Sequence, residues 1–300
     1  MKTLTTVLES AVTPLYESLL DDFDDLEKVS NSDIKSSIID FVGNNYTGAE
    51  KITISDKIND DGKYVVNIKG YNIQSKQNIK KLTNDFFIFG TIKGNFICHS
   101  CDNLISLEGA PKEVEGDFKC VHCHSLISLE GAPQKVGGNF ECYTCSKLKT
   151  LEGAPQKVGG NFVCDWCELL TNLKGSPEEV GKDFHCNCCD YLKTLEGAPQ
   201  KVGGSFECVE CNKLQSLKGA PKEVGGNFAC SYCNSLKTLE GAPQKVGQIF
   251  NCNGCKKLIS LEGAPKQVYG FRCSSCKGKF QESDVRKYCK EVVKIVCKGF

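Results

Sequence analysis

Apolar residues recur with one constant period through the middle of the chain. The motif F-x-C-x-x-C appears nine times between residues 96 and 276, and in all but the last unit two leucines follow it, three residues apart. Seven intervals between the first cysteines of successive units are 22 residues long, and the last is 21. Such a period, with one small unit per step, predicts a solenoid whose coils pack on their neighbours.

Each coil is expected to begin with a short strand at the F-x-C segment. Side chains alternate along a strand, so the phenylalanine and the first cysteine point to the same side. Gly-Gly before the strand permits a tight corner. One residue fewer separates Val268 from Phe271 in the last coil, which explains the 21-residue step. The residues of one coil that we expect to face inward are Val158, Phe162, Cys164, Cys167, Leu170 and Leu173.

Terminal coils of a solenoid need caps, and the flanking sequences are of that kind. The fold class predicted is mainly β with short helices, a solenoid of about nine coils with caps at both ends. The expected regions are 1–50, a helical leader with an acidic linker; 51–95, a β-rich N-terminal cap; 96–276, the solenoid; and 277–300, a C-terminal cap of a short helix and a strand.

Within the caps, further elements are predicted. The leader should hold helices at 3–20 and 33–42. The N-terminal cap should hold four short strands, and its Leu82, Phe86 and Ile88 repeat the spacing of the valine, phenylalanine and first cysteine of a coil. In the C-terminal cap, Ser283 is expected to cap a short helix that covers the open end with Val285, Tyr288 and Cys289, before a strand "VVKIVC". The four strands are expected within 51–55, 63–70, 71–76 and 85–90.

Charge and the N-terminal sequence exclude several functions. With 37 basic and 37 acidic residues the net charge is zero, so nucleic acid is not an expected partner. The first 20 residues contain neither a secretory signal nor a membrane span. A cytoplasmic location is therefore expected, where the 21 cysteines should be thiols or metal ligands.

The paired cysteines allow two main interpretations and a third, a disulfide within each pair, which is disfavoured because it would distort the strand-to-turn geometry. In the first, the cysteines are small buried hydrophobes and the second of each pair donates its S–H to a backbone carbonyl at the bend. In the second, pairs from adjacent coils bind zinc through the spacing C-x2-C-x18-C-x2-C. That spacing follows from any 22-residue repeat with two cysteines, and buried thiolates are costly. No cofactor is predicted, with zinc as the alternative. The two ladders comprise Cys98, Cys101, Cys120, Cys123, Cys142, Cys145, Cys164, Cys167, Cys186, Cys189, Cys208, Cys211, Cys230, Cys233, Cys252, Cys255, Cys273 and Cys276.

No arrangement of nucleophile, base and orienting acid occurs in a local motif, so no enzymatic activity is predicted. Four histidines flank cysteines, but none recurs from coil to coil. Cys188 lies outside the ladders and is expected to point outward as the most reactive thiol.

Function is expected on the positions beside the ladder cysteines, which change from coil to coil while the inward positions hardly vary. A repeat scaffold with one varied face is typical of a binding surface. Aromatic residues are common anchors of protein interfaces. The candidate binding residues are Tyr143, Trp166, Tyr232, His122 and His185.

The order of inward residues resembles the leucine-rich-repeat pattern L-x-x-L-x-L-x-x-N/C-x-x-L, with one extra residue between the valine and the phenylalanine. The tandem "SLEGAPKEVGGNFxC" unit, over residues 96–276 together with "SDVRKYCK", resembles leucine-rich repeats in uncharacterised proteins of large tailed bacteriophages and their bacterial hosts. "MKTLTTVLES" and "ESLLDDFDDLE" resemble phage leaders, some of which are cut after L-x-E sites such as Leu15-Tyr16-Glu17.

These observations together predict a non-enzymatic module that binds a protein partner. The resemblance implies that the module is associated with a phage or its host and lies in the host cytoplasm or the virion. Two alternatives stay open, a metal-binding or redox-responsive cysteine array and a structural virion component. The sequence identifies neither the partner nor the oligomeric state.

Overall fold

The computed structural model describes residues 30–77 and 79–297. The predicted helix at 3–20, most of the acidic linker and the Leu15-Tyr16-Glu17 site lie outside these residues. The chain divides into two units, residues 1–41 and 42–300. The predicted second helix is confirmed as α2 (Asn31–Asn45). Ser30 and Asp33 cap its start, because each side chain accepts a hydrogen bond from the other's backbone N–H, at 3.2 and 3.3 Å.

The first strands of the second unit form a small mixed sheet. Strands β1 (Tyr46–Thr47) and β2 (Lys51–Ile54) pair antiparallel with β3 (Tyr64–Ser75), and β3 pairs parallel with β4 (Phe87–His99). The two strands predicted at 63–70 and 71–76 are thus one strand, and the strand at 85–90 continues into the first F-x-C segment. Strands β3 and β4 pair over their length because both carry alternating buried residues.

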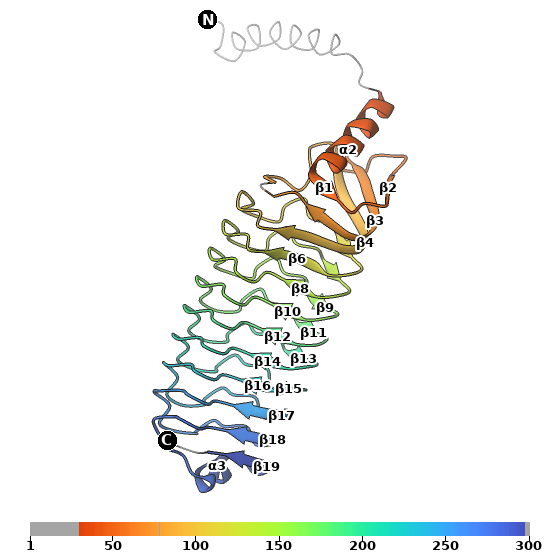
Figure 1. Cartoon of the computed structure of the whole chain (residues 1–300). Helices are drawn as coiled ribbons and strands as arrows, with labels where there is room; N and C mark the ends of the chain where they lie inside the picture. The colour runs from red at the N-terminus through yellow and green to blue at the C-terminus, as the bar shows by residue number, and fades with distance from the viewer. Residues whose placement is uncertain (1–29, 78, 298–300) are drawn as a thin grey trace, which may run out of the picture. The chain divides into compact units, whose positions relative to one another are not determined.

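The rest of the unit is a parallel β-solenoid of about 11 turns. Coils stack so that equivalent strands lie side by side (Figure 1). Most coils contribute two short strands, one ending at the valine and one beginning at the phenylalanine. The valine strands are β5 (Glu113–Val114), β7 (Lys135–Val136), β9 (Lys157–Val158), β11 (Glu179–Val180), β13 (Lys201–Val202) and β15 (Glu223–Val224). The phenylalanine strands are β6 (Phe118–Val121), β8 (Phe140–Glu141), β10 (Phe162–Val163), β12 (Phe184–His185), β14 (Phe206–Glu207) and β16 (Phe228–Ala229).

Side chains at equivalent positions stack along the interior and form the core. All six positions predicted to face inward are buried in every complete coil, which confirms the predicted pattern. Nine phenylalanines, from Phe96 to Phe271, lie face to face with ring centroids 5.0–5.8 Å apart. Tyr46 ends this stack: its ring lies 5.6 Å from that of Phe96, and its hydroxyl donates to the Leu82 carbonyl at 2.6 Å.

The degenerate first coil exists, but its predicted residues are wrong. Strand pairing places Ile68, Ile73 and Ser75 at the valine, phenylalanine and first-cysteine positions. Phe86, assigned to the core from its spacing, is 48% exposed, whereas Phe87 is fully buried. The segment "DFFIFG" has apolar residues on both faces of a strand, so only pairing with β3 selects which face is buried.

The C-terminal coils continue the same register. Strand β17 (Lys245–Asn251) pairs with β18 (Gln267–Arg272), and a bulge after Val246 absorbs the residue that the last coil lacks. Strand β19 (Glu291–Val296) confirms the predicted final strand and pairs in parallel with β18.

Helix α3 (Glu282–Tyr288) precedes β19, but its predicted cap is wrong. Gln281 is the N-cap, and its backbone N–H donates to the Asp284 carboxylate at 2.8 Å. Val285 and Cys289 are buried as expected, while Tyr288 is only half-buried. Asp284, the third residue of the helix, thus supplies the capping side chain, a role that the sequence had assigned to Ser283.

A ladder of polar side chains runs along the corner before the phenylalanine. In coil after coil, the side-chain oxygen accepts the backbone N–H of the equivalent residue in the next coil, at 2.6–3.1 Å. This ladder satisfies N–H groups at a corner where the strand ladder is interrupted. Its members are Asn95, Asp117, Asn139, Asn161, Asp183, Ser205 and Asn227.

Two kinds of glycine allow the coils to approach closely. Gly153 has a φ of +92°, and a Cβ there would lie 2.4 Å from the backbone of Glu130 in the preceding coil. In the Gly-Gly pairs, a Cβ on Gly159 would lie 2.2 Å from the carbonyl oxygen of Gly137. These pairs are not in the left-handed region, so close packing between coils, rather than the corner alone, requires them.

Candidate binding surface

The turn between the two cysteines of each coil holds one residue in the left-handed conformation. We call these nine residues the presenting row. Eight of them are not glycine, and their φ angles lie between 54° and 59°. A non-glycine residue in this conformation costs about 1–2 kcal/mol. The presenting row comprises Ser100, His122, Thr144, Trp166, Cys188, Glu210, Tyr232, Gly254 and Ser275.

The backbone of the presenting row is held in place by the coils. The Trp166 N–H donates to the Asn187 carbonyl of the next coil at 2.9 Å, and the Tyr232 N–H donates to the Asn253 carbonyl at 2.8 Å. The same bond recurs at the other members of the row from Ser100 to Gly254. Each side chain is therefore displayed from a rigid backbone, as pre-organised binding surfaces require.

The row carries chemically different side chains although the backbone is identical at each position. Glycine would adopt this conformation without strain, yet only Gly254 uses it. Burial does not explain the aromatic members, since Trp166 is 54% and Tyr232 is 52% exposed. Both are thus retained in a strained conformation while about half of their surface faces solvent.

Three of the five predicted binding residues lie on neighbouring coils. His122 contacts Tyr143 edge to face, with ring centroids 5.4 Å apart, and Trp166 follows on the next coil. The structure adds His99 at 5.2 Å and His124 at 6.3 Å from the His122 ring. Sequence reasoning missed this cluster because His99 and His124 occupy different positions of the repeat.

The other two predicted residues lie apart from that cluster. Tyr232 is three coils beyond Trp166, which corresponds to about 15 Å along the stack. Its ring covers Gly254, where a Cβ would lie 2.4 Å from the Tyr232 Cδ1. His185 is half-buried on β12. It lies near the Asp165 carboxylate and acts to lower the pKa of that group. The candidate surface is therefore centred on the coils from His99 to Trp166.

Part of the predicted outward face is wrong. Val121 is only 2% and Ser231 only 4% exposed. Asp165 does not present its carboxylate freely, because its Oδ1 accepts the Asn187 N–H at 2.6 Å. Burial raises the pKa of Asp165 above that of an ordinary aspartate. Three positions of each coil lie beside the ladder cysteines: one before the first cysteine and two between the cysteines. The second of the two between them forms the presenting row and is the one exposed in the most coils.

The second cysteines donate to backbone carbonyls, as predicted, and from Cys123 onward the acceptor lies on the preceding coil. The Cys145 thiol donates to the Cys120 carbonyl at 3.0 Å and the Cys167 thiol to the Cys142 carbonyl at 3.3 Å. Equivalent bonds of 3.1–3.6 Å link the other second cysteines from Cys123 to Cys276.

Several first cysteines also donate to carbonyls, as Cys164 does to His185 at 3.4 Å. Burial raises the pKa of the Cys164 thiol well above its usual value. Among the described residues, no group of three or more Cys, His, Asp or Glu side chains is arranged to hold a metal ion. Every cysteine is a free thiol.

Cys188 was expected to be the most reactive thiol, but its pKa is higher than that of an ordinary cysteine. Burial and the nearby Glu210 raise the pKa of its thiol to about 11. The thiolate is the nucleophilic form of cysteine, so Cys188 is a poor candidate for chemistry at neutral pH. The partial exposure of Cys188 confirms that it lies outside the buried ladders, while its raised pKa does not support the expected reactivity.

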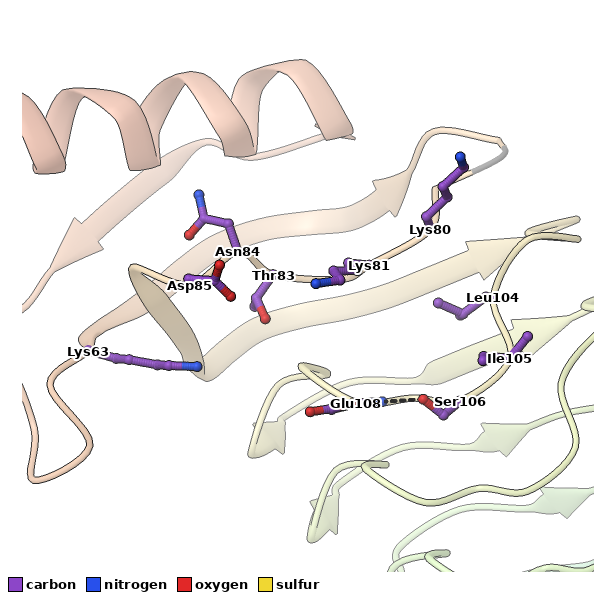
Figure 2. A pocket seen from close by; sticks show the side chains of 10 residues that line it. All are labelled: Lys63, Lys80, Lys81, Thr83, Asn84, Asp85, Leu104, Ile105, Ser106 and Glu108. Carbon is purple, nitrogen blue, oxygen red and sulfur yellow. Dashed lines mark hydrogen bonds between the residues drawn. The ribbon is translucent and has the colours of Figure 1, made fainter. Parts of the chain in front are cut away.

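A small hollow lies where the first coils meet, lined by Lys63, Lys80, Lys81, Asp85 and Glu108 among others (Figure 2). Its volume of about 230 Å³ is below that of ordinary ligand pockets. Charges of both signs line it, and in Figure 2 Lys80 points away from Lys63 and Lys81. It therefore provides no ligand site.

Comparison with protein-family models, with curated proteins and with solved structures gave no match. The fold defines the chain as a cysteine-rich β-solenoid repeat protein. Within the described residues, neither helix is long and apolar enough to span a bilayer.

Proposed function

We propose that this chain is a non-enzymatic, protein-binding solenoid of the leucine-rich-repeat type, which uses the presenting row near His122, Tyr143 and Trp166 to contact its partner. The observation that carries the proposal is the conformation of the row. Eight non-glycine residues occupy a left-handed position that glycine would occupy at lower cost. Strain that recurs at one place without a gain in burial is typical of a functional position.

The chemistry of the row suits a protein partner. Trp and Tyr supply large contact areas with few rotatable bonds and are enriched among interface hot spots. The histidine cluster beside them can donate, accept and stack, and it contributes no fixed charge in its neutral form. Zero net charge provides no field for a polyanion.

A photo-crosslinking amino acid placed at Thr144 tests the proposal. Thr144 lies in the presenting row between the coils of His122 and Trp166. The matched control carries the same group at the exposed Gln156, elsewhere on the same coil. We expect a crosslinked protein from position 144 alone, suppressed by excess wild-type chain but not by excess Trp166→Ala chain. Identical products from both positions would refute the proposal.

The proposed setting is the cytoplasm of a phage-infected bacterium or the virion itself. This part of the proposal is supported only by the resemblance of the repeat unit to phage and host proteins. Mass spectrometry of purified particles tests it, because a virion component would be present there at constant copy number. A chain found only in infected cytoplasm would favour a soluble binding role.

A further inference from the structure

Cys273, the last of the first cysteines of the repeat pairs, faces Cys297 at the end of the described solenoid. Arg272, the last residue of β18, pairs with Val296, the last residue of β19, so Cys273 and Cys297 directly follow in-register residues of adjacent parallel strands. Their Sγ atoms are 2.6 Å apart. Adjacent strands are spaced about 4.8 Å, which lies within the Cα separation that a disulfide spans, about 4.4–6.8 Å.

This pair differs from its counterparts inside the solenoid. The first-ladder thiols of Cys164, Cys186, Cys208 and Cys252 point to carbonyl oxygens of the following coil, at 3.3–3.5 Å. Cys273 instead directs its thiol at the Cys297 sulfur. Strand β19 ends the described solenoid, so the ladder finishes with a sulfur–sulfur contact.

Access to solvent also distinguishes the pair. Cys297 is partly exposed, whereas the interior ladder cysteines are buried. A hydrogen bond from the Cys273 thiol lowers the pKa of Cys297, while the same contact raises the pKa of Cys273. A partly exposed thiol with thiolate character is the kind that peroxide oxidises.

We propose that Cys273 and Cys297 form an oxidisable pair whose disulfide locks the terminal strand β19 onto the solenoid, with hydrogen peroxide as the oxidant. The Cys297 thiolate attacks one peroxide oxygen, which gives Cys297 sulfenic acid and, after protonation of the leaving hydroxide, one water. The Cys273 sulfur then attacks the Cys297 sulfur. The S–S bond forms, the S–O bond breaks, and the hydroxyl leaves with the Cys273 proton as a second water.

The structural consequence is confined to the edge of the sheet. Strand β19 is held by strand β18 on one side, and its Val293 is 72% exposed. Terminal strands of solenoids fray more readily than interior ones, since each coil is held only by its neighbours. The disulfide would link the two strands covalently and suppress that fraying.

Peptide mapping of the full chain tests the pair directly. Trypsin cleavage after Arg272, Lys277, Lys294 and Lys298 releases residues 273–277 and 295–298. Peroxide treatment of native wild-type protein is expected to link these two peptides, and a dithiol reductant should separate them. Slower amide exchange along β19 should accompany the link. Peptides that stay separate after peroxide treatment would overturn the proposal.

Cys276 shares the first peptide, so variants assign the sulfur. The link should persist in Cys276→Ala and in the interior control Cys252→Ala, and should be lost in Cys297→Ser. Loss of the link in Cys276→Ala, with its persistence in Cys273→Ala, would overturn the assignment. If Cys297→Ser disturbs the terminal coil, differential alkylation of wild type decides instead. Cys297 must react in the reduced protein and be protected after peroxide.

Discussion

Replacing Trp166 by alanine and, separately, by glycine distinguishes a side chain kept for binding from one kept for stability. Both variants lose the indole, which is 54% exposed. A fully buried tryptophan side chain buries up to about 250 Å². Slightly less than half of Trp166 is buried, which corresponds to about 110 Å². At about 25 cal/mol per Å², either variant loses about 2–3 kcal/mol as an upper estimate.

The two variants differ in the backbone. Alanine retains the cost of the left-handed conformation at φ 58°, about 1–2 kcal/mol, whereas glycine removes it. Glycine also has more conformational entropy in the unfolded chain, which lowers the stability of the folded protein by about 0.4–1 kcal/mol and offsets part of this benefit. We therefore expect Trp166→Gly to be more stable than Trp166→Ala by about 0.5–1 kcal/mol, the reverse of the usual order in regular secondary structure.

Urea unfolding measures stability, and photo-crosslinking competition through position 144 measures binding. If the indole is the contact, both variants compete equally poorly although their stabilities differ. The matched control is Ser275→Gly in the same row, which should gain stability and keep full competition. The reasoning would be refuted if Trp166→Ala were the more stable variant. Recovery of binding in proportion to stability would show that the indole acts only through folding.

Three further predictions follow from the described contacts. Asp165→Ala leaves the Asn187 N–H without its acceptor and should cost about 1–3 kcal/mol, whereas Asp165→Asn keeps the acceptor. Because burial raises the pKa of Asp165, the folded state binds the proton more tightly than the unfolded state. Stability should fall as pH rises from the ordinary aspartate pKa through the raised one, and Asp165→Asn should lack this fall in urea titrations at several pH values. Cys167→Ala removes the donor to the Cys142 carbonyl and should cost about 1–3 kcal/mol, measured by urea unfolding, with no change in metal content. Finally, all 21 cysteines should titrate as thiols in denatured, fully reduced protein purified without added metal, and a chelator should leave the melting temperature unchanged; co-purified zinc would favour the alternative cysteine-array function.

The core could be predicted from sequence because every coil repeats the same constraints. The positions of Val158 and Leu173 are apolar in almost every coil. The recurrence of the pattern therefore identified them as inward even where one coil alone would have been ambiguous. The bond of each second cysteine to a backbone carbonyl was predicted from the resemblance to leucine-rich repeats, but the sequence did not indicate which coil holds the acceptor. Where the repeat degenerates this support disappears, and the spacing of Phe86 predicted the wrong face.

The terminal coil shows a signal that was present but unused. Val292, Ile295 and Cys297 repeat the spacing of Val268, Phe271 and Cys273, so the final strand could have been placed in register. The polar corner ladder was equally visible as the Asn, Asp or Ser that precedes most of the repeat phenylalanines. The final strand was predicted without its register, and the polar ladder had no predicted role, because pairing and hydrogen bonds between coils are properties of the stack and not of one unit.

By itself, the sequence determined the period, the inward residues and the need for caps, because these follow from alternation and burial within one coil. Only the tertiary structure decided which varied positions are displayed. A left-handed residue that is not glycine leaves no mark in the sequence, and neighbouring coils cover Val121 while leaving Trp166 half exposed. Exposure at a turn depends on the side chains one coil away, which a pattern along a single chain does not encode.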